Sequence, residues 1–155
     1  TGATGATGAT GPMGEPGTAS GFASKTSTDA LPTSWQTVQS LSQSPQRTGT
    51  ITIARRSRLA ITASVTVFGN GLGALGTFTC RPKASSGGQD VPLEAVGVNT
   101  WGYVPDGINA FVSIPVVGSA LVAAGTYDVS VECIADHNAM VVTVDAYLVV
   151  QAAAA

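Results

Sequence analysis

Charged residues are scarce in this chain. They make up 10% of its 155 residues, with 7 Lys and Arg against 9 Asp and Glu, and the formal net charge is −2. This balance gives no electrostatic basis for binding nucleic acid or an anionic membrane surface. No apolar run approaches the roughly 18 residues that a membrane-spanning helix needs, and no segment of useful length shows a helical period. We therefore expect no nucleic-acid partner and no membrane insertion.

Residues for catalysis and metal binding are also few. His137 is the single histidine, and no nucleophile-elbow motif accompanies it, so a Ser-His-Asp triad is not indicated. The aspartates are scattered and lack the spacing of a calcium loop. They include Asp90, Asp106, Asp128, Asp136 and Asp145. We expect His137 to be a solvated hairpin residue, and the protein to have no catalytic residues, no metal and no cofactor.

The chain has two cysteines, Cys80 and Cys133. Each lies inside a strand-like segment, and their spacing fits no zinc-binding pattern. A disulfide between two strands is the favoured interpretation, and two buried free thiols are the alternative. A disulfide would favour an extracellular or virion-surface setting.

Glycine, in contrast, is regularly placed at the start of the chain. It occupies every third position over residues 1–17, at Gly2, Gly5, Gly8, Gly11, Gly14 and Gly17. This is a collagen-type Gly-X-Y repeat, in which three polyproline-II chains share an axis that only glycine fits. Pro12 and Pro16 pre-set the backbone angle that such a helix requires. The repeat predicts a short triple helix and therefore a trimer.

From Trp35 onward the apolar pattern is that of β-strands. In residues 57–68 every second residue is apolar, so that one face of the strand points to a core. The last strand is substantially apolar on both faces, which predicts that it lies between the domain core and a neighbouring subunit. The expected strands are 35–41, 50–54, 57–68, 75–81, 91–97, 100–104, 110–117, 126–135 and 140–150.

These patterns divide the chain into four parts. Residues 1–17 are the predicted stalk and residues 18–34, which are small and polar, a linker. Residues 35–151 form the head and residues 152–155 a tail. Many short strands separated by turn residues favour an all-β, jelly-roll-like sandwich for the head.

A collagen stalk before a small all-β head resembles a known arrangement. The stalk is carried by GATGATGATGPMGEPG, and the head by AAGTYDVSVECIADHNAMVVTVDAYLVV. The combination resembles the C1q and tumour-necrosis-factor group, bacterial collagen-like surface glycoproteins and collagen-stalked phage fibres. The Ala- and Thr-rich, aromatic-poor style favours a bacterial or phage source. The triplet repeat begins in mid-phase and no signal peptide is visible, so we expect a processed product or a fragment of a longer stalked protein.

An arginine cluster is the first candidate ligand-binding feature. Arg55, Arg56 and Arg58 lie close together in the sequence. In a trimer they would bind an anionic sugar, or pair with Glu94 or Glu132 across a subunit boundary. The alternative is a solvated strand entry.

Two aromatic residues are the second candidate. Trp101 and Tyr103 are two residues apart, so their rings share a face of one strand. Exposed rings of this kind stack on sugars, whereas buried ones would belong to the core or to a subunit interface.

The resemblance and the trimer together imply a function without covalent chemistry. We expect a structural and adhesive trimeric fibre protein on an extracellular surface or virion, whose stalk presents the head to a cell-surface glycan or protein receptor. Threefold display would strengthen weak contacts through effective concentration. The alternative is a purely structural trimerisation cap on a collagen-like filament, with no ligand of its own.

Overall fold

The computed structural model describes most of the head. The described residues are 19–27, 34–40, 50–70, 76–94, 100–105, 109–135 and 142–155. Within these ranges the chain forms strands, turns and bends, and none of it forms a helix that could cross a membrane. The predicted triple helix, with Gly2, Gly5, Gly8, Gly11, Gly14 and Gly17, and the loop that holds His137 lie outside the described residues.

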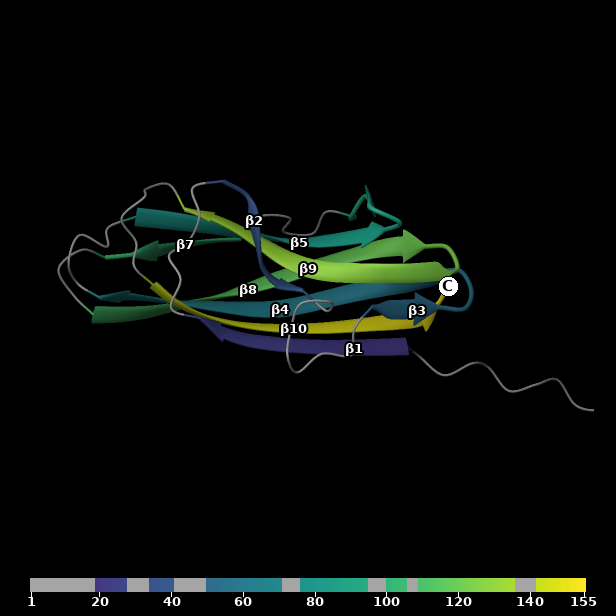
Figure 1. Cartoon of the computed structure of the whole chain (residues 1–155), viewed down its shortest axis with the longest axis horizontal. Helices are drawn as coiled ribbons and strands as arrows, with labels where there is room; N and C mark the ends of the chain where they lie inside the picture. The colour runs from purple at the N-terminus through teal and green to yellow at the C-terminus, as the bar shows by residue number, and fades with distance from the viewer. Residues whose placement is uncertain are drawn as a thin grey trace, which may run out of the picture.

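The strands form two antiparallel sheets that lie in two layers (Figure 1). The first sheet has the order β1-β10-β4-β8. Its strands are β1 (Ala19–Ser27), β10 (Val142–Ala154), β4 (Ser57–Asn70) and β8 (Asn109–Val122).

The second sheet has the order β2-β9-β5-β6, with β3 also pairing with β9 and β7 with β5. Its strands are β2 (Gln36–Ser40), β9 (Gly125–Ala135), β5 (Gly76–Ser86), β6 (Gln89–Asp90), β3 (Ile51–Ile53) and β7 (Thr100–Val104).

The strand pairs are nested along the chain. β1 pairs with β10, β2 and β3 pair with β9, β4 pairs with β8, and β5 pairs with β7. Such an antiparallel ladder, folded over so that successive pairs alternate between two sheets, is a jelly roll. The head is therefore an all-β jelly roll, as the strand pattern predicted.

Alternation of apolar and polar residues places the core between the layers. In β4, Leu59, Ile61 and Val65 are fully or almost fully buried, whereas Ala60 and Thr62 point outward. β9 contributes Val129 and Val131 in the same way, and β10 contributes its own alternate residues. The period of two predicted from the sequence is confirmed in these strands, because each strand packs one face on the opposite sheet.

Several predicted boundaries were wrong. Residues 18–34 do not form a continuous linker, because Ala19–Ser27 pair with β10 along their whole length. Residues 152–154 continue β10 and are not a tail. Residues 91–93 form no strand, and Glu94 makes an isolated bridge to Ser119. Small polar residues hid the first strand, since backbone pairing to a neighbouring strand requires no apolar side chain.

One tight turn follows directly from glycine chemistry. Gly87 and Gly88 connect β5 to β6, and both have positive φ, at 57° and 79°. Two successive residues of this conformation make a two-residue hairpin turn that matches the strand twist. The turn brings Asp90 opposite Ser85.

The register also separates two ends of the head. Ala19 lies opposite Ala152, which in turn lies opposite Leu59, so β1 begins where β10 ends and β4 begins. The C-terminus marks this end in Figure 1. Asn70 and Asn109 pair at the far end. We call the first the N-terminal end, because the chain enters the head there, and the second the distal end.

Candidate functional site

The outer face of the sheet β1-β10-β4-β8 carries exposed apolar side chains among small polar ones, and we call it the apolar face. One row across it consists of Phe22, Val149, Thr62 and Val117, each opposite the next. Among the side chains described on this face, Arg58 is the single charged one. The other outward side chains include Ser64, Pro115, Leu121 and Tyr147.

Large apolar side chains on this face are open to solvent in the single chain. Tyr147 is 52% exposed, and Phe22, Val117 and Val149 are each 40% exposed. The last strand is apolar on both sides. Leu148 and Val150 face the core, whereas Tyr147 and Val149 lie on this open face.

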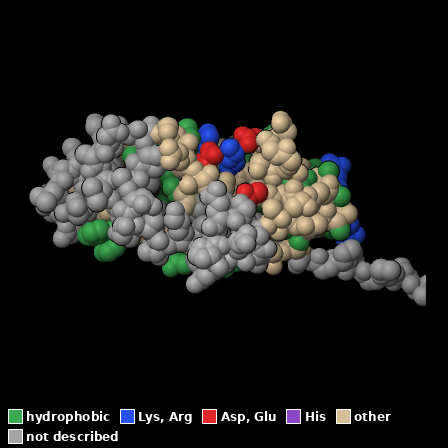
Figure 2. Space-filling model, viewed as in Figure 1, with side chains coloured by type: hydrophobic (Ala, Val, Ile, Leu, Met, Phe, Trp, Pro, Cys, Tyr) green, Lys and Arg blue, Asp and Glu red, His purple; other side chains and the backbone are tan. Residues whose placement is uncertain are grey.

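The outer face of the other sheet carries ion pairs, and we call it the charged face. Arg81 of β5 lies directly opposite Glu132 of β9 and donates two hydrogen bonds to one carboxylate oxygen, from Nη2 at 2.8 Å and from Nε at 3.1 Å. Lys83 Nζ lies 3.0 Å from the other oxygen, Oε1. The Arg81 guanidinium stacks over the Trp35 ring at 4.1 Å. Figure 2 shows basic and acidic side chains gathered on this side of the molecule.

Glu132 is the anion on which these contacts converge. Its side chain is only 8% exposed, and such burial by itself raises the pKa of a carboxyl group. Hydrogen bonds from Arg81 and Lys83 together outweigh burial, so the pKa of Glu132 lies below its ordinary value. The hydrogen bond to Glu132 is likewise the main cause that raises the pKa of Lys83. At neutral pH Glu132 and Lys83 are therefore both ionised.

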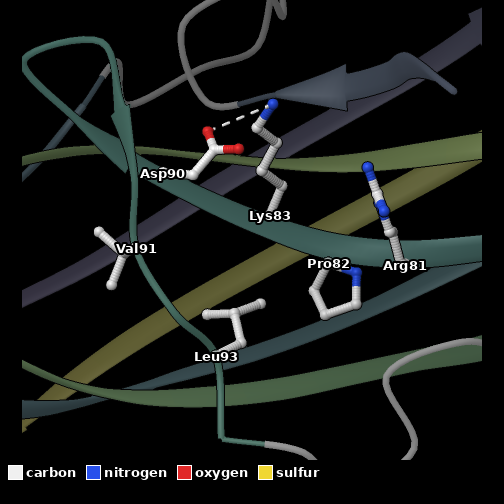
Figure 3. A pocket seen from close by; sticks show the side chains of 6 residues that line it. All are labelled: Arg81, Pro82, Lys83, Asp90, Val91 and Leu93. Carbon is white, nitrogen blue, oxygen red and sulfur yellow. Dashed lines mark ion pairs between the residues drawn. The ribbon is translucent and has the colours of Figure 1, made fainter.

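Beside this network lies a small pocket of about 210 Å³. It lies beside the part of β5 between its two ladders on that side, because β7 pairs with β5 up to Cys80 and β6 pairs from Ser85; among the described residues, Val91 N–H donates a backbone hydrogen bond to Ala84 O there. Pro82 lies within this gap, a position where a missing N–H costs no ladder bond. The pocket is drawn in Figure 3. Its lining consists of Arg81, Pro82, Lys83, Asp90, Val91 and Leu93.

The structure places Trp101 and Tyr103 on the outer face of β7. Trp101 is 67% exposed and Tyr103 is 48% exposed, whereas Gly102 between them faces the core. Across the ladder they lie opposite Thr79 and Thr77 of β5. Burial in the core of the single chain is thereby excluded, and both rings are open to solvent.

The arginine cluster is not brought together with these aromatic residues. Arg55 and Arg56 lie in the turn before β4 at the N-terminal end, whereas Trp101 pairs in the half of β5 nearer the distal end. Arg58 forms an ion pair with Glu94 of the same chain. Glu132 is held within the chain by Arg81 and Lys83 of the adjacent strand. A pairing of the arginine cluster across a subunit boundary stays a prediction.

Cys80 and Cys133 form a disulfide between β5 and β9. They are direct partners in the ladder, with Cα atoms 4.1 Å apart, and both are fully buried. The bond lies on the core side of the sheet, one residue from Arg81 and Glu132 on the charged face. It therefore fixes the register of the two strands that carry the ion pairs.

The charged network itself was missed from the sequence. Arg81 and Lys83 alternate with apolar residues in β5, and Glu132 does so in β9, which is the usual pattern of solvated side chains. The one available signal was that Cys80 and Cys133, if paired, would place Arg81 and Glu132 next to each other. Among the described residues, no group of three or more His, Cys, Asp or Glu side chains could hold a metal ion.

No protein-family model matches the sequence, and no curated protein does. Among solved structures, the chain is similar to Eiger TNF from S. frugiperda, with 13% identity, a TM-score of 0.42, and coverage of 89% of this chain and 93% of that one. The jelly-roll assignment above depends on strand order and not on this likeness.

Proposed function

We propose that this chain is a structural and adhesive homotrimeric surface protein, in which a collagen triple helix of residues 1–17 carries three jelly-roll heads. The triplet repeat requires three chains, and the apolar face supplies a surface that association would bury. The single observation that carries the proposal is this face, which is almost uncharged and bears exposed Phe22, Tyr147 and Val149. The disulfide is in keeping with an extracellular surface or virion.

The symmetry of such a trimer has a structural consequence. Around a threefold axis the contact is heterologous, so the apolar face of one head meets a different surface of the next. The triple helix is short and marginal on its own, so the heads must hold the three chains in register. Chain association would then depend on the apolar face and not on the stalk alone.

Sedimentation of charge-substituted variants tests the trimer. Val149→Lys places a charge in the centre of the apolar face, and we expect it to convert trimers to monomers because the charge would be desolvated. Thr52→Lys is the matched control, since Thr52 is exposed on β3 of the other sheet. A parent protein that sediments as a monomer, or a Val149→Lys trimer as stable as the parent, contradicts the proposal.

Trp101 separates the adhesive function from a purely structural cap. If its ring contacts a ligand, Trp101→Ala keeps the trimer but loses binding on a glycan array. If its ring completes the subunit contact, the same variant weakens the trimer. An intact trimer that binds nothing on a broad array, before or after the substitution, would favour the structural cap over adhesion.

A further inference from the structure

The pocket beside β5 combines an apolar floor with a cationic rim. Pro82 and Leu93 lie next to each other on the floor, and Val91 borders it (Figure 3). Behind them is Gly118 of β8, where an added Cβ would lie 2.7 Å from Pro82 Cγ and 3.5 Å from Leu93 Cδ1. Glycine at this position lets the floor pack directly on the backbone of β8. The rim carries Arg81 and Lys83, and the Lys83 ammonium is joined to Asp90 by the ion pair marked in Figure 3.

Lys83 has two anionic partners that differ in burial and in distance. Glu132 is nearly buried and lies 3.0 Å away, whereas Asp90 lies 3.4 Å away with 71% of its side chain exposed. An exposed pair at this distance contributes little to stability. Asp90 is thus the partner that an external anion could replace, and its carboxylate marks where that anion would lie.

We propose that this pocket binds one acidic sugar unit, whose carboxylate replaces that of Asp90 beside Lys83 while its ring covers the half-buried Val91 and Leu93. This ligand class rests on the adhesive function proposed above and makes it more specific. The Asp90 carboxylate competes with the carboxylate of the sugar for Lys83. Glu132 acts as a positioning residue, because it holds Lys83 and Arg81 on one side of the pocket.

Size and chemistry favour a sugar acid over other anions. A volume of about 210 Å³ is below the roughly 300–1,000 Å³ of pockets for drug-sized ligands, so it suits a single ring. An inorganic anion would leave the apolar floor uncovered. A neutral sugar would form no ion pair with Lys83. A saturated ring that bears a carboxylate meets both surfaces. Weak binding at one site would be multiplied by threefold display.

The test uses two sugars that differ only at the acidic group. Methyl glucuronide and methyl glucoside are titrated into the full chain, and binding is followed by saturation-transfer and chemical-shift NMR. We expect the glucuronide to bind and the glucoside to bind at least about threefold more weakly. Asp90→Asn should tighten glucuronide binding by about twofold, because the exposed pair that it removes is weak. Lys83→Gln should weaken it by a similar factor.

The control variant is Asp128→Asn, which changes the net charge equally but lies on β9, across β5 from the pocket. Equal gains for Asp90→Asn and Asp128→Asn, equal binding of the two sugars, or binding of neither would overturn the proposed site. Sedimentation of the same samples keeps the two proposals apart. A trimer that binds neither sugar would remove this site alone, whereas a monomer that binds the glucuronide would remove the trimer alone.

Discussion

At the residue scale, Glu132 is the most deeply buried of the described charged side chains. It is a buried carboxylate on the outer face of a sheet, where a solvated side chain would be expected from alternation. Arg81, Lys83 and the Trp35 ring compensate for the burial through hydrogen bonds and cation–π stacking. Removing one partner of such a cluster is costly, because the other charges are left without compensation.

We therefore expect Glu132→Gln to lower the free energy of unfolding by about 2–3 kcal/mol at pH 7. The matched control is Asp90→Asn, whose exposed pair should contribute less than about 0.5 kcal/mol. Urea unfolding of the three proteins measures the difference. A Glu132→Gln protein as stable as the parent would show that the network contributes no net stability.

The pH dependence of stability follows from the same group. The pKa of Glu132 in the folded chain lies below its ordinary value of 4.5, so its stabilisation is complete above that value and is lost as pH falls through the folded pKa. For Lys83, whose pKa is raised above 10.5, the loss occurs as pH rises through the folded pKa. Parent and Glu132→Gln should therefore converge in stability at strongly acid pH, which urea unfolding across a pH series would measure. A constant difference between them would contradict this assignment.

Gly102 gives a second prediction at this scale. A Cβ there would lie 2.6 Å from two atoms of the buried Phe78 ring and 3.1 Å from Ile114 Cγ2. We expect Gly102→Ala to destabilise the head by about 1–3 kcal/mol through overpacking. Gly125→Ala is the control, since its Cβ would meet Tyr127 at ordinary contact distances of 3.4–3.6 Å. Thermal unfolding that ranks the two variants the other way would contradict the packing of β7 on the core.

At the scale of elements, the pair β5 and β9 is the centre of the second sheet. β9 also pairs with β2 and β3, and β5 with β6 and β7, so the register of this one pair positions the whole charged face. The Cys80–Cys133 disulfide secures that register. A shift of one residue in either strand would turn that strand's side chains over, so that Arg81 and Glu132 would point to opposite faces of the sheet.

Reduction of the Cys80–Cys133 disulfide should therefore lower the stability of the head. For a sequence separation of 53 residues, the chain-entropy relation gives about 4 kcal/mol. We expect a reductant to lower the free energy of unfolding by this order, as measured in urea. The Cys80→Ala/Cys133→Ala protein is the control, because a reductant should leave it unchanged. Free thiols in freshly purified protein would rule out the bond.

At the scale of the whole molecule, the two sheet faces differ in chemistry. Among the described side chains, one face bears exposed apolar groups with Arg58 as its single charge, and the other bears the ion pairs of Arg81, Lys83 and Glu132. This asymmetry suits a chain that meets its own copies on one side and other molecules on the other. The N-terminal end, where β1 begins, is the end to which a stalk would be attached.

The proposed stalk makes its own prediction. Gly8→Ala should lower the melting temperature of the triple helix, because the added methyl group would collide at the shared axis. The head should keep its own unfolding transition and its trimeric state. Circular dichroism resolves the two transitions, and Ala9→Ser, at a position that faces away from the axis, is the control. If Gly8→Ala leaves the melting temperature of the first transition unchanged, the result would contradict a triple helix.

Much of the fold was predictable because strand periodicity is local. The alternation over residues 57–68 and the apolar residues of β9 are visible in the sequence, and the structure confirms both. The first strand was not predictable, since Ser20, Gly21 and Ser24 are held by pairing with β10, which is more than a hundred residues away. The cluster at Glu132 was hidden for the same reason, as its partners come from a different strand.

By itself, the sequence determined the alternation that makes an all-β head and the glycine period that predicts three chains, because both are spacings between neighbouring residues. Only the tertiary structure decided which strands pair, that Arg81 and Lys83 surround Glu132, and that the arginine cluster and Trp101 lie apart. These depend on register between distant segments. Register is set by the burial of whole faces and not by any one stretch of sequence.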